Sequence, residues 1–517
     1  MSTNKYSLNR HNHAIARSAG VISLATLISR ILGFIRDMII ARLFGIYIYA
    51  QAFVIAFRIP NLFRDLVGEG ASNAAIIPVL SEYNLKHSKE EFWELANILL
   101  NLLAVILSAI TILGIIFSPL IVRLLAPGFI ASPEKLAATI NLNRIIFPYI
   151  LLIGLAAYAM ALLNSLKNFT VSAFAPCLLN ISIIICVLFI GEGTAGLAIG
   201  VLLGGILQLA VQIPVLYKKG FRPKFKWSLK HPGVIQIKKL MLPRLASSGI
   251  YQLNNFVDSI FSSLAGIVGE GGVAVLYFSY RLIQFPIGIF SNAVAQAILP
   301  TFSTQALEDD QQNLKATLFW GLRVVFFVML PMSALFMVLA QPIVFTFFGG
   351  GRFDVQSGLL TSNALIFYSI GLCAYGGTKI LQCCFFALKD TVTPTKIAGV
   401  ALVMNVILNT LLMFPLKIGG LALATSISGI ITFFFLFFIL GRRLGGFHER
   451  KILFSFLRIF AASFCMAAVC YLVNQTLNLA WALFCGGLSY IMFCLLFRVE
   501  ELKELIYWLL NKKTGQT

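Results

Sequence analysis

Basic side chains inside otherwise apolar stretches are the residues of this sequence best suited to chemistry. Five of them lie far from any polar loop: Arg30, Arg36, Arg58, Arg281 and Lys379. If these stretches cross a membrane, each charge costs on the order of a few kcal/mol and is expected to face water or protein. A guanidinium group can hold two phosphate oxygens at once, so clustered arginines in a region of low dielectric constant predict an anion-binding site. Four more basic residues stand near the ends of apolar stretches, where snorkelling to the membrane surface explains them: Arg144, Arg244, Arg323 and Arg458.

The first apolar stretch, SLATLISRILGFIRDMIIARLFG, places Arg30 near its middle and Arg36 and Asp37 further along. Residues seven apart share one stripe of a helix, so Arg30 and Asp37 are predicted to face the same way. An internal ion pair with Asp37 is the alternative to ligand binding for either arginine, but one carboxylate cannot neutralise both. We therefore assign all three residues to substrate binding.

The second stretch, AFRIPNLFRDLVGEGASNAAIIPVLSEY, carries Arg58 before Pro60 and Arg64 after it. Proline interrupts the helical hydrogen bonds between these two arginines. Both are assigned to substrate binding, with snorkelling as the alternative for Arg64. Asp65 and Glu69 are four apart on one helix face, and they are predicted to pin Arg64 or to close a gate.

Arg281 lies about eight residues inside another apolar stretch, which corresponds to roughly 12 Å along a helix axis. A buried partner within the protein is the alternative to substrate binding at this position. In these stretches the arginines outnumber the carboxylates. The excess predicts a polyanionic substrate that crosses the membrane or flips within it.

A different set of polar residues predicts a site for a coupling cation. Asp258 is a second deeply placed acid, and Asn405, Asn409 and Thr425 supply amide and hydroxyl oxygens in later apolar stretches. Oxygen donors of this kind suit Na+ or a proton-carrying water. Hydrogen bonds that hold helices together are the alternative for the same side chains.

The composition indicates the setting of these residues. Of 517 residues, 59% are hydrophobic and only 12% are charged, and the mean hydropathy is +0.89. Soluble domains carry about 25% charged residues, so a soluble enzyme is excluded. The net charge of +20 does not indicate nucleic-acid binding, because lysines and arginines fall in short loops between apolar stretches. The nine cysteines lack metal or redox spacing, and we expect free thiols, no metal site and no cofactor.

Apolar segments long enough to cross a membrane number fourteen by this pattern: 19–41, 46–67, 96–126, 138–165, 171–191, 195–217, 240–267, 273–300, 317–348, 358–388, 394–415, 418–441, 452–473 and 479–498. An even number of spans puts both termini on one side, and the loops of that side carry most of the loop lysines and arginines. Both termini are therefore predicted to be cytoplasmic. Residues 1–18 and 499–517 become cytoplasmic tails, and the basic run 218–239 becomes a cytoplasmic linker that contacts anionic phospholipid.

The chain also repeats itself weakly. Four pairs of residues in similar contexts recur 222 or 223 positions apart: Arg58 and Arg281, Pro78 and Pro300, Pro119 and Pro342, and Lys167 and Lys389. A shift of six spans preserves orientation, so the pattern predicts two parallel six-helix lobes over residues 19–217 and 240–441. Repeats of this kind place the substrate site between the lobes near mid-membrane, and 452–498 is an appendage outside them.

Several motifs resemble those of the MurJ/MviN family of bacterial lipid II flippases, within the superfamily of multidrug and oligosaccharidyl-lipid exporters: SRILGFIRD, FRIPNLFRDLVGEGASNAAIIPVLSEY, FPYILLIGL, FAPCLLNIS and YRLIQFPIGI. The resemblance implies fourteen helices, two lobes around a central cavity, and a groove for the polyprenyl tail beside 452–498. It implies undecaprenyl-pyrophosphate carrying the peptidoglycan disaccharide-pentapeptide as substrate. By motif position, the important cavity residues of the family fall on Arg30, Arg36, Asp37, Arg64 and Arg281.

The sequence departs from some members of that family at two positions. Gln51 and Gln284 stand where those members carry acids. The departures leave Arg281 less neutralised, and the energetics of coupling do not follow from the resemblance.

The combined interpretation is an alternating-access lipid II flippase of the bacterial inner membrane, not an enzyme. It is expected to act as a monomer near other cell-wall synthesis proteins, with Na+ or H+ as coupling ion. The alternatives are a flippase for another polyprenyl-linked oligosaccharide and a cation-coupled drug antiporter, which a positive cavity disfavours. A membrane-embedded glycan transferase would need a catalytic carboxylate or histidine in a sizeable outer loop, and the predicted outer loops are short.

Overall fold

The protein is almost entirely helical, as the composition predicts. The computed structural model describes residues 2–65, 75–191, 193–308, 310–446 and 449–504, and within these ranges the only strand-like pairing is an isolated bridge between Gly350 and Phe353. Internal contacts divide the chain into two compact units, Met1–Ala265 and Gly266–Thr517. Each unit is described by itself below.

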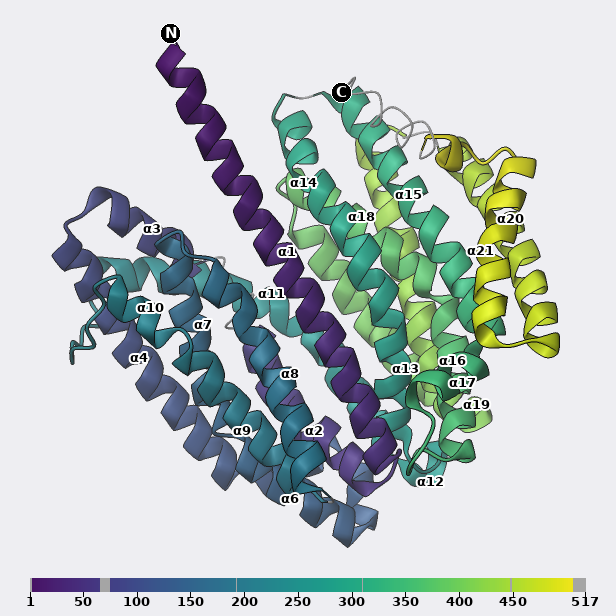
Figure 1. Cartoon of the computed structure of the whole chain (residues 1–517), viewed down its shortest axis with the longest axis horizontal. Helices are drawn as coiled ribbons and strands as arrows, with labels where there is room; N and C mark the ends of the chain where they lie inside the picture. The colour runs from purple at the N-terminus through teal and green to yellow at the C-terminus, as the bar shows by residue number, and fades with distance from the viewer. Residues whose placement is uncertain (1, 66–74, 192, 309, 447–448, 505–517) are drawn as a thin grey trace. The chain divides into compact units, whose positions relative to one another are not determined.

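The first unit is a bundle of long helices joined by short ones. Helix α8 packs against α1 and α9, α7 packs against α4 and α9, and α2 packs against α6 (Figure 1). Glycines on α9 make the closest of these approaches possible, because a Cβ at Gly200 would lie 2.7 Å from the Ile183 Cα of α8. The elements are α1 (Ser2–Phe44), α2 (Ile48–Phe63), α3 (Ile77–Lys86), α4 (Lys89–Ile116), α5 (Ser118–Leu125), the 3-10 turn η2 (Pro127–Ala131), α6 (Pro133–Ile146), α7 (Tyr149–Ser165), α8 (Thr170–Ile190), α9 (Ala195–Ala210), α10 (Ile213–Lys218) and α11 (Pro232–Ser263).

The second unit begins within the short helix α12 (Ala265–Val268) and is a second bundle of packed helices. Helix α15 contacts α18 and α20, and α20 packs along α21. Helix α19 is broken after Pro415, where Lys417 adopts a left-handed backbone (φ 51°, ψ −129°), between two segments predicted as separate spans. The elements are α13 (Gly272–Pro286), the π-helical turn η3 (Ile287–Ser291), α14 (Asn292–Leu307), α15 (Gln311–Val338), α16 (Ala340–Phe348), α17 (Val355–Ile370), α18 (Leu372–Ala387), α19 (Val392–Leu444), α20 (Glu449–Thr476) and α21 (Leu479–Leu496).

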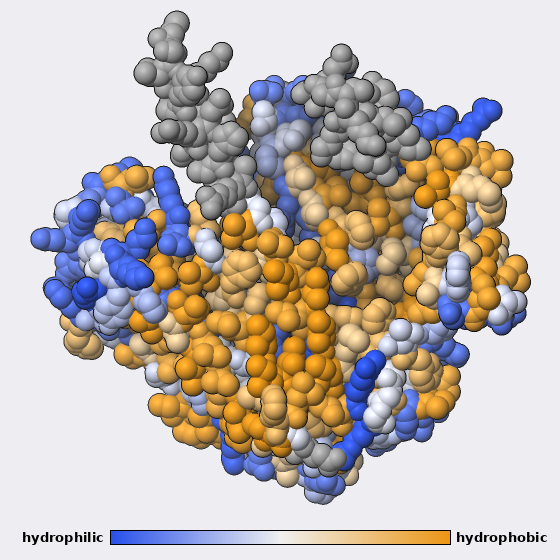
Figure 2. Space-filling view, viewed as in Figure 1, coloured by the Kyte–Doolittle hydropathy of each residue, from blue (hydrophilic) through white to orange (hydrophobic). Residues whose placement is uncertain are grey.

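Apolar side chains project outward from both units, as a membrane protein requires. Figure 2 shows them over α8 and α9 in the first unit and over α20 and α21 in the second. Phe189 on α8 and Phe464 on α20 are 85% and 68% exposed. Hydrophilic side chains gather instead over α3 and α10 (Figure 2). This distribution fits surfaces that face lipid along their length and water at their ends.

The described residues contain nine helical segments long and apolar enough to cross a membrane. A tenth results if α17 and α18, which meet at a 45° bend, count as one span, whereas α2 is apolar but only 16 residues long. Each of the fourteen predicted segments lies mainly on helical residues, although several contain short non-helical breaks, as at 147–148 and 211–212, and residues 66–67 of the second lie outside the described residues. The all-helical membrane fold is confirmed, and the count of fourteen stays a prediction.

Identical helix ends recur in the two units and support the predicted repeat. Lys167 follows α7 and Lys389 follows α18, and both have a left-handed φ of 58°. In each case the next residue donates its N–H back across the turn, from Asn168 to the Leu163 carbonyl and from Asp390 to the Phe385 carbonyl, both at 2.9 Å. The two positions are 222 residues apart, which is the spacing of the sequence repeat.

The boundary between the units differs from the predicted lobe boundary at residue 240. Helix α11 contacts α3, α4, α5 and η2, so residues 240–265 belong to the first unit. At its end the Gly128 N–H donates to Ser263 Oγ at 3.1 Å, and a Cβ at Gly128 would lie 1.9 Å from the Ser263 carbonyl oxygen. The sequence predicts residues 240–267 as a separate span, but α11 is not among the nine segments counted above, and this close approach fixes its end against η2 in the first unit.

Candidate functional site

The interface of α1 and α8 holds a buried arginine and a buried carboxylate. Arg36 is 3% exposed and Asp37 is fully buried. Arg36 donates from Nε and Nη2 to Asp37 Oδ1 at 2.9 and 2.7 Å, and from Nη1 to Asn180 Oδ1 at 3.1 Å. Asn180 of α8 in turn donates to the Ser29 carbonyl at 3.1 Å. The ion pair therefore joins α1 to α8, and neither charged side chain is accessible in this structure.

Arg30 differs from Arg36 in its surroundings. Its side chain is exposed, and no hydrogen bond or ion pair of Arg30 occurs among the described residues. The predicted alignment of Arg30 with Asp37 therefore gives no ion pair between them among the described residues, because Asp37 pairs with its chain neighbour Arg36. Arg30 is thus an accessible cation of α1, and its contact with substrate stays a prediction.

The polar end of α2 lies against α11. Arg58 donates to the Asn255 carbonyl. Arg64 and Asp65 form an ion pair at 3.0 Å, and Gln252 donates to the second carboxylate oxygen of Asp65 at 3.4 Å. Asp65 thus pins Arg64, one of the two roles predicted for it. Glu69, its predicted partner in a gate, lies outside the described residues.

Arg281 contacts neutral groups of its own helix, α13. Its Nη2 donates to the Tyr277 hydroxyl at 3.0 Å and its Nη1 to Gln284 Oε1 at 3.1 Å. The guanidinium carbon lies 5.1 Å from the centre of the Tyr277 ring. Gln284, one of the two positions where the family resemblance leads us to expect an acid, is therefore an uncharged partner of Arg281.

The four residues of the predicted cation site fall in both units. Asn409 donates to Asn405 at 2.9 Å and Asn405 donates to Thr425 at 3.4 Å, which ties the two halves of α19 together. Both asparagines are fully buried. Asp258 lies on α11 in the first unit. The contacts among Asn405, Asn409 and Thr425 are hydrogen bonds that hold helical segments together, which is the alternative to a cation site stated above. Within the described ranges no group of three or more His, Cys, Asp or Glu could hold a metal ion.

Three polar residues that hydrogen-bond to the charged side chains of the predicted site were not predicted from the sequence. Asn180, Gln252 and Tyr277 each contact a residue of the predicted site. All three are polar side chains within or beside apolar stretches, and this property alone singles them out as candidates. Their pairing with particular arginines depends on tertiary packing and is not visible in the sequence.

From its place near the end of an apolar stretch, Arg323 is predicted to snorkel to the membrane surface, but its side chain is buried. It belongs to a cluster that we call the C-terminal latch (Arg323, Ser455, Glu500, Glu501 and Glu504). Its Nε donates to Glu501 at 2.5 Å, and Glu500 and Glu504 lie 3.1 and 3.7 Å from its other nitrogens. The Ser455 hydroxyl of α20 also donates to Glu501. Residues 499–504, the described start of the predicted cytoplasmic tail, are therefore docked on α15 and α20.

Glu501→Gln is expected to lower the free energy of unfolding by about 2 kcal/mol, because it weakens a buried ion pair while Glu500 and Glu504 remain. Glu504→Gln makes the same charge change at a half-exposed side chain and is expected to cost less than about 0.5 kcal/mol. Unfolding of purified protein in detergent would measure both. Equal losses for the two variants would contradict the latch.

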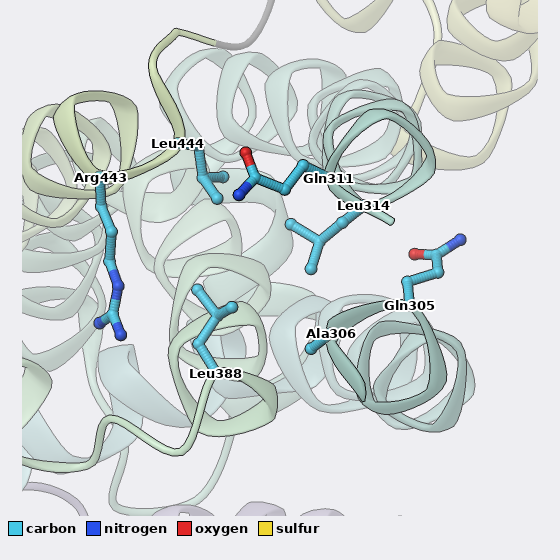
Figure 3. Close-up of a pocket in the computed structure, with 7 residues that line it drawn as sticks. All are labelled: Gln305, Ala306, Gln311, Leu314, Leu388, Arg443 and Leu444. Carbon is cyan, nitrogen blue, oxygen red and sulfur yellow. The ribbon is translucent and has the colours of Figure 1, made fainter. Parts of the chain in front are cut away.

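A small cavity of about 100 Å³ lies near the same end of the second unit (Figure 3). Its lining comes from α14, α15 and the ends of α18 and α19, as Gln305, Ala306, Gln311, Leu314, Leu388, Arg443 and Leu444. Arg443 is held at 2.7 Å by Asp390. Burial raises the pKa of Asp390, but hydrogen bonds from Thr393 and the charge of Arg443 outweigh it and leave the pKa below its ordinary value. Pockets for organic ligands usually measure about 300–1,000 Å³, so this cavity is too small for a glycolipid headgroup.

Comparisons with known proteins agree with these features. A family model described as lipid II flippase MurJ matches residues 40–491. A probable lipid II flippase MurJ of Buchnera aphidicola subsp. Acyrthosiphon pisum is 36% identical over 83% of each chain, and one of Vibrio cholerae is 34% identical over 81% of each. A solved structure of lipid II flippase MurJ in an inward closed conformation has a TM-score of 0.81 and 31% identity, covering 94% of this chain and 99% of its own. An inward-facing multidrug resistance MATE transporter shares the fold alone, with a TM-score of 0.68 and 15% identity over 83% of this chain and 98% of its own.

Proposed function

The chain belongs to the MurJ family of lipid II flippases, and from this premise we infer that it carries lipid II from the inner to the outer leaflet of the bacterial cytoplasmic membrane. The agreement with relatives over more than four fifths of the chain is the observation that carries this conclusion. Flipping changes the position of the lipid and no covalent bond, so the protein acts as a transporter and not as an enzyme. The similarity to drug transporters is one of fold and does not favour drug export.

Exposed Arg30 and partly buried Arg281 support a role in holding the pyrophosphate of the substrate. Arg30 is accessible and has no partner among the described residues, and Arg281 contacts a neutral glutamine and a tyrosine. We assign direct contact with phosphate oxygens to these two residues. Arg36 and Asp37 are assigned to fixing α1 against α8, which sets the position of Arg30 one to two turns away. Arg58 and Arg64, which contact α11 directly or through Asp65, complete the basic set of the first unit.

The orientation and the partners follow from charge. Both termini are proposed to be cytoplasmic, because the basic loops lie on their side. The protein is proposed to act as a monomer, near other cell-wall synthesis proteins and in contact with anionic phospholipid. A pair of exposed apolar helices, α20 and α21, is proposed to hold the polyprenyl tail.

Depletion of the protein in living cells tests the function. Lipid II exposed on the outer face of the cytoplasmic membrane is expected to fall while lipid II on the inner face accumulates. Another polyprenyl-linked oligosaccharide measured in the same cells serves as the control and is expected to keep its distribution. The opposite pattern would identify the alternative substrate.

Coupling to an ion gradient is proposed to involve Asp258, the acid of α11. Asp258→Asn is expected to remove the dependence of transport in vesicles on Na+ or pH, because the variant lacks the charge that a bound cation offsets. Asn405→Asp adds a carboxylate to the part of the predicted cation site that lies on α19. It is the reciprocal of Asp258→Asn, which removes one.

The competing route is the membrane potential, which acts on the arginines at about 2.3 kcal/mol per charge per 100 mV. If Asp258→Asn leaves the response to Na+ and pH unchanged while an imposed potential still alters the rate, the cation site is wrong and the potential drives transport.

A further inference from the structure

The connection between α10 and α11 is a strap held along α4. The strap comprises residues 221–230, which contain no helix. Asn101 of α4 donates from one amide nitrogen to the carbonyls of both Lys224 and Lys226, at 2.9 and 3.0 Å. The Lys224 N–H donates to Asn97 Oδ1 at 2.6 Å. Carbonyls of residues two apart that point to one side indicate an extended chain, which α4 holds in place through two asparagines.

The strap alternates between two kinds of side chain. Phe225, Trp227 and Leu229 are 81%, 48% and 64% exposed. The residues before, between and after them are basic or polar: Lys224, Lys226, Ser228 and Lys230. In an extended chain such alternation separates an apolar face from a basic one. Large apolar side chains this exposed mark a surface that is covered by something other than the unit itself.

The apolar side chains of the strap are not incomplete core. Phe221, at its start, is 4% exposed and its ring lies 5.7 Å from that of Trp93 on α4. The core of the first unit therefore takes the first aromatic residue of the strap and leaves the later ones outside. Phe225, Trp227 and Leu229 are exposed because this part of the strap lies outside the core of the first unit.

That position coincides with the level at which α4 becomes apolar. The polar start of α4, KEEFWE, ends at Glu94, and Asn97 and Asn101 lie one and two turns into the apolar run. Tryptophan is enriched at the boundary between lipid tails and water, and lysine bends its ammonium group to the headgroups there. Lys226 lies 3.4 Å from Glu94, and Arg222 packs over the Tyr217 ring. Lys224 and Lys230 form no ion pair with the described acids of the strap or of α4, so their charges are available to a ligand.

We propose that the strap is a binding surface for anionic phospholipid headgroups of the cytoplasmic leaflet, with Phe225, Trp227 and Leu229 inserted among the lipids and the lysines on the phosphates. The inference rests on the orientation proposed above and names the surface that meets the lipid. Because α11 begins two residues after the strap, a headgroup bound there also fixes the membrane depth at which α11 starts.

Tryptophan fluorescence in lipid nanodiscs tests the proposal. The signal of Trp227 is the difference between the protein and its Trp227→Phe variant. Phosphatidylglycerol with brominated acyl chains is expected to quench that signal at least twofold more strongly than brominated phosphatidylcholine at equal mole fraction. Lys224→Gln with Lys230→Gln is expected to remove the preference, since each lysine near an anionic surface contributes roughly fivefold in lipid binding at low salt. Raising the salt concentration should reduce it in the unmodified protein as well.

Lys396→Gln with Lys451→Gln is the matched control, because it removes the same charge from two exposed lysines outside the strap. The control is expected to keep the preference. Quenching of Trp227 by aqueous iodide and not by either bromolipid would overturn the proposal and leave the strap to a water-soluble partner. Equal loss of preference in both double variants would also overturn it, because net charge would then explain the effect. Neither readout depends on lipid II, so loss of lipid II transport in the unmodified protein would count against the proposed function alone.

Discussion

Arg30→Ala is expected to abolish growth of cells that depend on this protein, while the amount of protein in the membrane stays unchanged. Arg30 is exposed, so its removal breaks no contact among the described residues and costs little stability. A hydrogen bond between charged groups contributes about 1.5–3 kcal/mol, so the loss of one arginine from the pyrophosphate corresponds to roughly a 10- to 150-fold loss in binding. Arg30→Lys is expected to restore function in part, because lysine keeps the charge but cannot hold two oxygens in one plane.

The control for Arg30 is Arg123→Ala, which removes an exposed arginine from α5, outside the predicted substrate site. It is expected to grow normally at an equal protein level. Normal growth of Arg30→Ala in the same assay would show that this arginine does not contact the substrate.

Asp37→Asn is expected to lower the stability of the protein by about 3–5 kcal/mol and to impair transport at every pH. The variant leaves the guanidinium of Arg36 buried without a full countercharge, and a broken buried pair costs about this much. Arg36→Gln combined with Asp37→Asn replaces the pair by neutral groups that can still hydrogen-bond to each other and to Asn180. The double variant is expected to recover much of the stability.

Unfolding of the single and double variants in detergent gives the coupling energy of the pair. A double variant no more stable than the sum of the single losses would show that the two charges do not act together. A loss of activity for Asp37→Asn that disappears at low pH would indicate proton transfer through this carboxylate, contrary to the positioning role assigned here.

The fold could be predicted from the sequence because it depends on a property spread over many residues. Long apolar segments identify membrane helices even when single boundaries are misplaced by several residues. The division into units differs from the prediction, since the sequence assigned residues 240–267 to the second lobe, whereas α11 packs on α3, α4 and η2 of the first unit. Hydropathy records how apolar a helix is and contains nothing about its neighbours.

The candidate site shows the same limit at the level of single contacts. Spacing along a helix aligned Arg30 with Asp37, yet the carboxylate pairs with Arg36, the adjacent residue, because both lie on the face that α8 covers. The stripe argument assumes that a side chain points straight out from its helix, and a long arginine need not do so. Likewise the position of Arg323 close to the end of a span predicts a side chain that reaches water, but in the structure it forms a buried ion pair with Glu501, near the end of the described chain. Contacts of this kind join residues far apart in sequence and leave no pattern in it.

Basic residues in left-handed conformations carry a consequence for the biogenesis of the protein. Lys167, Lys389 and Arg498 each follow a helix with φ between 54° and 58°, where glycine would relieve a strain of about 1 kcal/mol. Glycine would also delete a positive charge from a loop that helps to orient its neighbouring helices during insertion. A relaxed backbone and a charge that favours correct insertion therefore make opposite demands at these three helix ends, and this chain carries the charge.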